Sequence, residues 1–419
     1  MEEVKVLIVA SKLGYQTRIF AEAARRLGLE PVLATDRCGR MEDPWRDGAF
    51  ALKFYRPEES ARRVERSVRG VCGVVAAGDK PALAASYIAR RLSLPFHPPK
   101  AVEAAGNKDL SRRKLSRAGL PVPRFRSFAL NTPPEEACAK SGLPCVLKPT
   151  GLSGSRGVIR ADDPKEFQAA FLRIKALLDC PELLRHRDPT LGFIQVEDYI
   201  EGREFALEGM VTDGALQTLA IFDKPDPLEG PFFEESVYTT PSRHPTETQQ
   251  ALREAIQRAV TALGLTHGPV HAEARINSRG VWVLEAAARP IGGLCARTLR
   301  FNGGTPLEEV ILRHATGQPL QSLTLDGPAS GVMMIPIPRN GIYQGCDGLE
   351  DARRTSQIQG IEITARPGQI FRQLPEGGSY LGFIFARSTT PARVESALRR
   401  AHAKLRFRFA TMLPVLMTT

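Results

Sequence analysis

Short apolar runs alternate with helix-like segments in the first quarter of the chain. The runs at 5–10, 31–35 and 71–76 have the length and the β-branched content of buried strands. A segment with helical spacing follows the first run and ends at Gly28, a residue type that commonly ends helices. Because alternating strands and helices usually build a parallel sheet covered by helices, we expect a Rossmann-like α/β domain over residues 1–106.

Further helices are predicted by their caps and apolar faces. Asn107 is expected to cap a helix that ends at Gly119, and Gly78-Asp79 to open one that runs to about Leu92. Thr246 and Gln249 have the spacing of a capping box in front of an amphipathic helix. That helix presents one apolar face and ends at Gly264; a last amphipathic helix is expected over 391–405.

The second half of the chain is richer in strands. Residues 270–276 and 281–287 read as two strands joined by a turn at 277–280. After about residue 325 the chain consists of short strand-like pieces with many glycines and prolines before the final helix. We therefore expect a β-rich C-terminal region.

Composition narrows the class of protein. No apolar run approaches the ~20 residues that span a bilayer, so a membrane protein is not expected. The net charge of +11 comes from basic residues spread along the chain as pairs, which favours a solvated surface with local anion sites over nucleic-acid binding. The seven cysteines are scattered and lack zinc-ligand spacing, which is typical of a reducing, cytoplasmic setting.

Two segments suggest nucleotide binding. A buried strand delivers Lys148 directly before a loop rich in glycine and serine, Gly151 to Gly157, whose amides could surround phosphate oxygens. Glu197 and Glu204 flank a turn between apolar runs, where a carboxylate could accept from ribose hydroxyls. Each segment alone is also compatible with a ligand-free loop. An NAD site is disfavoured because the turn after the first strand, 11–14, has one glycine where the dinucleotide fingerprint needs three.

The strongest pattern is a charged hairpin. Period-two geometry puts His271, Glu273 and Arg275 on one face of a strand. Across the turn Glu285 falls opposite or nearly opposite Glu273, about 5–7 Å away. Two close carboxylates repel unless a cation lies between them, and hard oxygen ligands suit Mg²⁺. The alternative is an ion-pair cluster in which Glu273 pairs with Arg275 and Glu285 with Arg289.

Together these motifs, in this order and with Asn107-Lys108-Asp109 ahead of them, resemble the ATP-grasp superfamily. The sequence around 271–293 is similar to that of the L-amino acid ligase branch of this superfamily, the dipeptide synthetases. The resemblance extends from about residue 4 to 405. It implies an ATP-grasp fold, with α/β and α+β elements, divided into an N-terminal domain (1–106), a small subdomain with the glycine-rich loop (107–200), a large subdomain with the metal and substrate site (201–320) and a β-rich C-terminal subdomain (321–419).

The resemblance also implies a role for each motif. ATP would be bound by Lys108, Lys148, Ser155, Arg156, Gly157, Glu197, Ile200, Glu204 and Leu284, with Mg²⁺, as one or two ions and with Mn²⁺ as a substitute, on Glu273 and Glu285. Arg289 and Lys224 would act at the reacting groups, and amino-acid substrates would be bound by Glu235, Tyr238, His271, Arg289, Gly292 and Gly293.

Two departures leave details open: the first is from the superfamily and is shared by the L-amino acid ligase branch, and the second is from that branch. Glu285-Ala286-Ala287 lacks the asparagine of the usual metal motif, which leaves the number of ions open, and Tyr238 replaces a histidine, which leaves the substrate open. The expected reaction is ATP-dependent coupling of a carboxylate to an amine through an acyl phosphate. A bicarbonate-using ligase and an ATP-binding regulatory protein without turnover are the alternatives. The sequence does not determine the oligomeric state, and a homodimer stays open.

Overall fold

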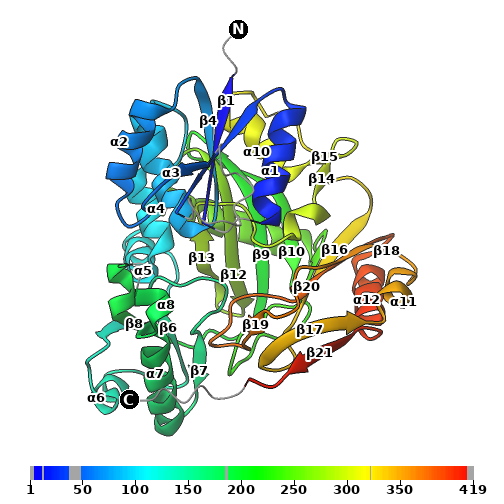
Figure 1. The fold of residues 1–419 in the computed structure, drawn as a ribbon. Helices are drawn as coiled ribbons and strands as arrows, with labels where there is room; N and C mark the ends of the chain where they lie inside the picture. The colour runs from blue at the N-terminus through cyan, green and yellow to red at the C-terminus, as the bar shows by residue number, and fades with distance from the viewer. Residues whose placement is uncertain (1–3, 12–13, 37–48, 185–186, 321, 413–419) are drawn as a thin grey trace.

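A parallel four-stranded sheet forms the N-terminal part of the molecule, as the alternating pattern predicts (Figure 1). The computed structural model describes residues 4–11, 14–36, 49–184, 187–320 and 322–412. Residues 12 and 13 of the predicted first turn, and Cys38, lie outside this range. In sheet order the strands are β3 (Ala49–Ala51), β2 (Glu30–Thr35), β1 (Lys5–Ala10) and β4 (Val71–Ala77), accompanied by α1 (Tyr15–Arg26), α2 (Pro57–Ser67) and α3 (Asp79–Arg91).

The next part of the chain forms a small subdomain (residues 125–198) with its own hydrophobic core. Two helices, α4 (Pro99–Gly106) and α5 (Lys108–Arg117), lead into it, and the Asn107 side chain caps α5 by accepting from the Leu110 amide, as predicted. Its sheet runs β5 (Phe125–Ala129), β8 (Phe193–Asp198), β6 (Cys145–Pro149) and β7 (Ile159–Ala161), with α6 (Pro134–Ala139), α7 (Pro164–Leu178), α8 (Pro181–Leu184) and the 3₁₀ turn η1 (Pro189–Gly192).

One eight-stranded antiparallel sheet forms the centre of the molecule. It carries the predicted hairpin at one edge and crosses the predicted boundary at 320/321 to include C-terminal strands. In order it runs β13 (Gly280–Ala287), β12 (Gly268–Asn277), β9 (Arg203–Thr212), β10 (Ala215–Asp223), β11 (Val237–Thr240), β16 (Ala329–Ile335), β20 (Gly382–Ser388) and β18 (Ile358–Ile363).

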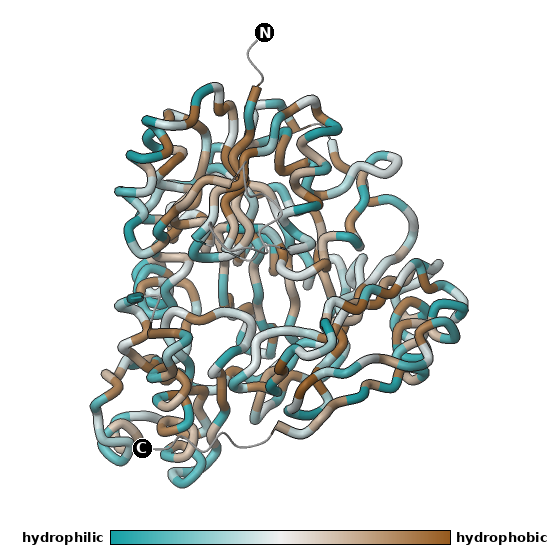
Figure 2. Tube along the Cα trace, viewed as in Figure 1, coloured by the Kyte–Doolittle hydropathy of each residue, from teal (hydrophilic) through white to brown (hydrophobic). Residues whose placement is uncertain are grey.

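Smaller elements complete the C-terminal half, which is rich in strands as expected. Figure 2 shows apolar residues concentrated along the strands inside the molecule. The remaining elements are α9 (Thr246–Leu263), η2 (Cys295–Thr298), β14 (Arg300–Phe301), β15 (Thr305–Pro306), α10 (Leu307–Ala315), β17 (Gly341–Asp347), α11 (Leu349–Arg353), β19 (Ile370–Phe371), α12 (Pro391–His402) and β21 (Arg406–Ala410).

The predicted capping box of α9 is wrong, although the helix and its C-terminal Gly264 are confirmed. Pro245 precedes the helix and Thr246 is already its first residue, so the threonine hydroxyl is not in the capping position. The Gln249 amide instead donates to the carbonyls of Ser242 and His244. The apolar face predicted for this helix is buried in full.

The described part of the chain bears on the expectations about membrane spans and cysteines. No helix there is long and apolar enough to cross a membrane. The six cysteines described, at 72, 138, 145, 180, 295 and 346, are all unbridged.

The buried face of α9 gives a test of the central core. Ile256 is 1% exposed and belongs to the cluster that joins the N-terminal domain to the central sheet. Ile256→Ala should lower the free energy of unfolding by about 2–5 kcal/mol, because it removes buried methyl groups and leaves a cavity. The matched control is Glu254→Ala on the exposed face of the same helix, with a change within about 0.5 kcal/mol. Urea unfolding followed by circular dichroism checks both; equal midpoints would contradict the packing described.

Candidate active site

A buried ion-pair network holds the lysine that precedes the glycine-rich loop (residues 150–157). Lys148 lies at the end of β6, and its Nζ is 2.5 Å from Oε2 of Glu197 on the neighbouring strand β8. Oε1 of Glu197 is 2.8 Å from Nε of Arg112, which is also buried. Burial lowers the pKa of Lys148 to about 8, although Glu197 counteracts this effect. At neutral pH the lysine is therefore an ammonium fixed at the mouth of the loop.

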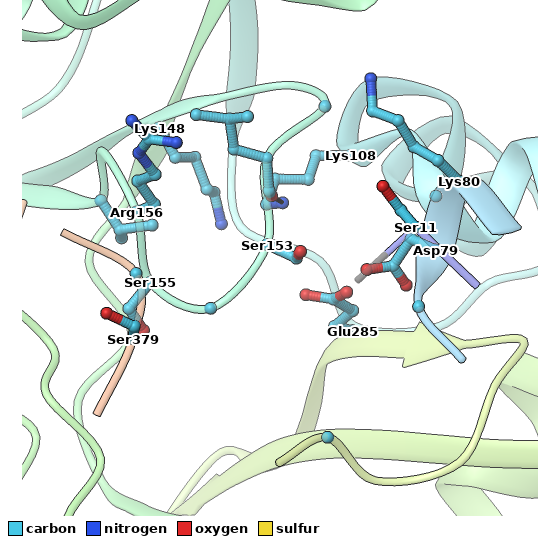
Figure 3. A pocket seen from close by; sticks show the side chains of 18 of the residues that line it. Ser11, Asp79, Lys80, Lys108, Lys148, Ser153, Ser155, Arg156, Glu285 and Ser379 are labelled. Atoms are coloured by element: carbon cyan, nitrogen blue, oxygen red, sulfur yellow. Dashed lines mark hydrogen bonds between the residues drawn. The ribbon is translucent and has the colours of Figure 1, made fainter. Parts of the chain in front are cut away.

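The glycine-rich loop needs glycine at its far end. Gly157 has a φ of +75°, and a Cβ there would lie 2.7 Å from a ring carbon of Pro149. Lys108 Nζ donates to the carbonyl of Leu152 at 2.5 Å, so the second predicted phosphate-binding lysine contacts the loop directly. Figure 3 shows Lys108 and Lys148 on the loop side of the pocket and Glu285 on the facing side.

The hairpin places its two carboxylates as the sequence predicts. Glu273 of β12 and Glu285 of β13 are paired residues in the antiparallel register, and the register shifts immediately after Glu273. Nζ of Lys224 is 3.3 Å from Glu273, and Nε2 of His271 is 3.7 Å from it. Glu285 contributes to raising the pKa of Arg289. This register is compatible with the metal hypothesis. The arginines of the ion-pair alternative have other partners: Arg275 pairs with Glu204, and Arg289 pairs with Asp79.

Lys224 lies in a cage of three carboxylates. Its Nζ is 2.7 Å from Oε1 of Glu204, pairs with Glu235 and is 3.3 Å from Glu273. The three carboxylates offer oxygens that all lie within 4.8 Å of one another. Burial lowers the pKa of Lys224, but the surrounding carboxylates outweigh this and raise it well above its usual value. Burial and the neighbouring Glu273 raise the pKa of Glu235 to about 7.

Lys224 lies behind these carboxylates and does not line the cleft in front of them. Three groups expected at adenine and ribose are also held by the protein: Glu197 by Lys148, the Ile200 carbonyl by Arg275 at 2.6 Å, and Glu204 by Arg275 at 2.9 Å. Their roles toward a nucleotide stay predictions.

Sequence reasoning missed Glu208, a fully buried carboxylate in β9. Its Oε2 is 3.0 Å from Nδ1 of His271, and both its oxygens are 3.1 Å from the amide of Ile291. Burial lowers the pKa of His271, but Glu208 and Glu273 raise it to about 9, so the ring is an imidazolium near neutrality. Glu208 thereby fixes both His271 and the start of the segment containing Gly292. The available signal was a single carboxylate within the apolar run 205–211.

Asp79 is the second residue that was missed, since it was expected only to open a helix. It follows β4 at the carboxyl edge of the parallel sheet, where α/β folds commonly bind ligands. Its Oδ1 accepts from Nε of Arg289 at 2.8 Å. Burial opposes charge on Arg289, but Asp79 and Glu285 raise its pKa above the usual range. The N-terminal domain thus orients the arginine of the central sheet.

Most of the predicted site residues line one cleft of about 1840 Å³. Tyr238 lines it from β11, with its ring 5.2 Å from Nζ of Lys224 and 5.5 Å from the Phe222 ring. Gly157 lies outside the lining, as Lys224 does. The predicted residues that line the cleft are Lys108, Lys148, Ser155, Arg156, Glu197, Ile200, Glu204, Glu235, Tyr238, His271, Glu273, Leu284, Glu285, Arg289, Gly292 and Gly293.

Comparison with known protein families gives matches to two segments of the chain. Residues 141–298 match the ATP-grasp domain, and residues 333–410 match the L-amino acid ligase C-terminal domain 2. An uncharacterised protein of Sinorhizobium fredii, y4rH, is 24% identical over 95% of this chain and 81% of its own length. The alanine–anticapsin ligase of Bacillus subtilis is 27% identical over 51% of this chain and 47% of its own length.

A solved structure agrees with these matches. The L-amino acid ligase from Bacillus licheniformis superimposes with a TM-score of 0.82 at 25% identity, covering 98% of this chain and 100% of that one. Residues 141–298 of the chain therefore match an ATP-grasp domain, residues 333–410 match the C-terminal domain 2 of the L-amino acid ligases, and the fold as a whole is similar to that of a solved L-amino acid ligase.

Proposed function

We propose that the protein joins the carboxyl group of one amino acid, or a close relative, to the amine of another and consumes ATP as its third substrate. The observation that carries this proposal is the arrangement of one cleft: two lysines and a glycine-rich loop on one side, and paired carboxylates with an oriented arginine on the other. The likeness to the L-amino acid ligases supports this reading over that of a carboxylating ligase, in which bicarbonate is the group that ATP activates.

The chemistry explains why phosphate groups must be held here. A free carboxylate is a poor acyl donor because oxide is a very poor leaving group. Transfer of the γ-phosphoryl group from ATP to a carboxylate oxygen breaks the bond to ADP, which leaves, and gives an acyl phosphate. The amine then attacks the acyl carbon, phosphate leaves with the bonding electrons, and the attacking nitrogen loses a proton. Lys148 and Lys108 would neutralise phosphate charge, and their fixed positions avoid reorganisation during transfer.

The amino acid that donates its carboxylate would lie against Arg289. A guanidinium offers paired donors that match a carboxylate, and Asp79 already fixes its orientation. The amides of Gly292 and Gly293 would add donors nearby. Glu235 would accept from the α-ammonium group, and Tyr238 would contact the side chain. Tyr238 is 2% exposed and its phenol cannot titrate near neutrality, because burial raises its pKa well above the usual value.

The hairpin carboxylates fit a divalent ion by their chemistry. Glu273 and Glu285 are paired in register and provide hard oxygen ligands. Lys224 lies closer to Glu204 and Glu235 than to Glu273, which is 3.3 Å away. We therefore assign Mg²⁺ to Glu273 and Glu285. When bound, the ion supplies charge neutralisation at the phosphates.

The products test the proposed reaction directly. Incubation with ATP and mixtures of amino acids should give ADP, phosphate and a new amide in equal amounts, because cleavage at the γ-phosphate accompanies each coupling. Mass spectrometry and nucleotide chromatography measure all three. AMP and pyrophosphate would overturn the mechanism. ADP formed only with bicarbonate would favour the carboxylating alternative, and ATP binding with no turnover under any acceptor would favour a regulatory protein.

Lys148→Ala should weaken ATP binding on the order of 10- to 100-fold, since it removes a charge-assisted contact, and should abolish turnover in the folded protein. Because the pKa of Lys148 is about 8, its ammonium is present below that pH and is lost above it. Wild-type ATP affinity should therefore fall as pH rises above 8, and the variant should lack this dependence.

Calorimetric titration at several pH values measures both effects, with circular dichroism to confirm folding. The control is Lys140→Ala, which removes an exposed lysine of the same subdomain. Wild-type affinity in Lys148→Ala would exclude this lysine from the phosphate site.

Glu285→Gln should raise the Mg²⁺ concentration needed for half-maximal activity on the order of tenfold, because one of two charged ligands is lost. Activity measured across a magnesium series checks this, with the exposed Glu254→Gln as control. If the series is unchanged, Glu285 serves only to balance Arg289.

A further inference from the structure

Arg173 of α7 joins three segments that are distant in the sequence. Its Nε and NH2 donate to the two carboxylate oxygens of Glu376 at 2.5 and 2.9 Å. Its guanidinium carbon lies 5.1 Å from the ring centroid of Phe232. Glu376 belongs to a loop of the C-terminal region, residues 372–380, and Phe232 lies three residues before Glu235. A paired fork of this kind fixes direction as well as distance.

The 372–380 loop also holds the glycine-rich loop. The amide of Gly157 donates to the Pro375 carbonyl at 2.8 Å, and Nε of Arg156 donates to the Glu376 carbonyl at 2.9 Å. Figure 3 shows Ser155 and Ser379 next to each other, and a Cβ on Gly378 would lie 3.5 Å from the Arg156 side chain. The two loops are therefore in direct contact.

A tight turn gives the 372–380 loop its shape. The amide of Gly377 donates to the Gln373 carbonyl at 2.8 Å. A Cβ on Gly377 would lie 1.8 Å from the carbonyl oxygen of Arg372, so only glycine fits there. This turn points Glu376 at α7 and lets the chain continue to Tyr380.

One end of this connection lines the proposed amino-acid side of the cleft, and the other lies three residues before Glu235 in the sequence. Tyr380 lines the cleft, and its ring packs 6.2 Å from the Phe383 ring. Burial and the nearby Glu235 raise its pKa. Phe232 packs on the core of the small subdomain and bridges to Ile159 in β7. Movement of either segment on amino-acid binding would therefore be transmitted to Arg173.

The small subdomain depends on such contacts for its position. Its fully buried hydrophobic cluster lies within residues 128–196 and contains no residue of the N-terminal domain or the central sheet. The subdomain can therefore move as a unit, and polar contacts to neighbouring segments influence where it rests.

We propose that Arg173 and Glu376 are positioning residues that couple closure of the glycine-rich loop over ATP to occupation of the amino-acid side of the cleft. This inference rests on the proposed function. An acyl phosphate left open to solvent is lost when water attacks the acyl carbon. The bond from that carbon to the phosphate oxygen then breaks, phosphate leaves with the electron pair, a proton passes to solvent and the free amino acid is regenerated. A closed loop prevents this wasteful cycle.

The test uses Arg173→Ala, Glu376→Gln and the charge-exchanged double variant Arg173→Glu with Glu376→Arg. Each single change should speed release of a fluorescent ATP analogue about two- to fivefold, as expected for a partly exposed ion pair. It should also raise the ratio of ADP to amide above one. The double variant should move both values back toward wild type, which a merely structural defect would not do. Lys175→Ala, which removes an exposed ion pair of the same helix, is the control.

The outcomes separate this inference from the proposed function. Wild-type release and ADP-to-amide ratios in both single variants, or equal changes in the control, would overturn the coupling role. If no amino-acid pair yields an amide, the proposed function fails, and the release rates still report on the loop contact. Faster release with an unchanged product ratio would also overturn the coupling, because loop closure would then not protect the intermediate.

Discussion

The cost of burying charge governs this site. An ionised group taken out of water is tolerated only when opposite charges and hydrogen bonds surround it. Glu197 satisfies this condition between Lys148 and Arg112, and Lys224 does so among three carboxylates. Removing any one partner would leave a buried charge uncompensated, so the groups hold one another in place. These mutual ion pairs fix the side chains that line the proposed phosphate and metal sites.

Strand adjacency in the central sheet brings these charges together. β9 lies between β12 and β10, so Arg275 stands opposite Glu204, and Asp223 stands opposite Phe205 with Lys224 following it. Residues from segments that are far apart in the sequence thus lie on neighbouring strands, and their side chains are in direct contact. Asp79 reaches the same place from the edge of another sheet, which makes the cleft a product of two domains and a subdomain.

Local patterns predicted much of this arrangement. Period-two alternation and a short turn determine which residues of a hairpin face each other, and the Glu273–Glu285 pairing followed from them. The alternation of strands and helices in the first quarter of the chain predicted the parallel sheet, because a helix commonly connects two parallel strands. Partners of Asp79 and Glu208 lie 210 and 83 residues away, and periodicity carries no information about such contacts. The pairing of β11 with β16, which carries the central sheet past residue 320, is equally long-range.

The continuous central sheet affects how the C-terminal region can be exchanged between proteins. Strand β11 carries Tyr238, and its four residues pair fully with β16. A chimaera that replaced residues 333–410 would remove β20, which pairs with β16 along its whole length. Unless the new segment supplied a strand in the same register, β16 would become a sheet edge with unpaired backbone groups. The matched C-terminal segment is thus a recognisable sequence unit, but it is not a detachable module. Backbone hydrogen bonds through β20 and β16 tie this segment to β11, the strand of Tyr238.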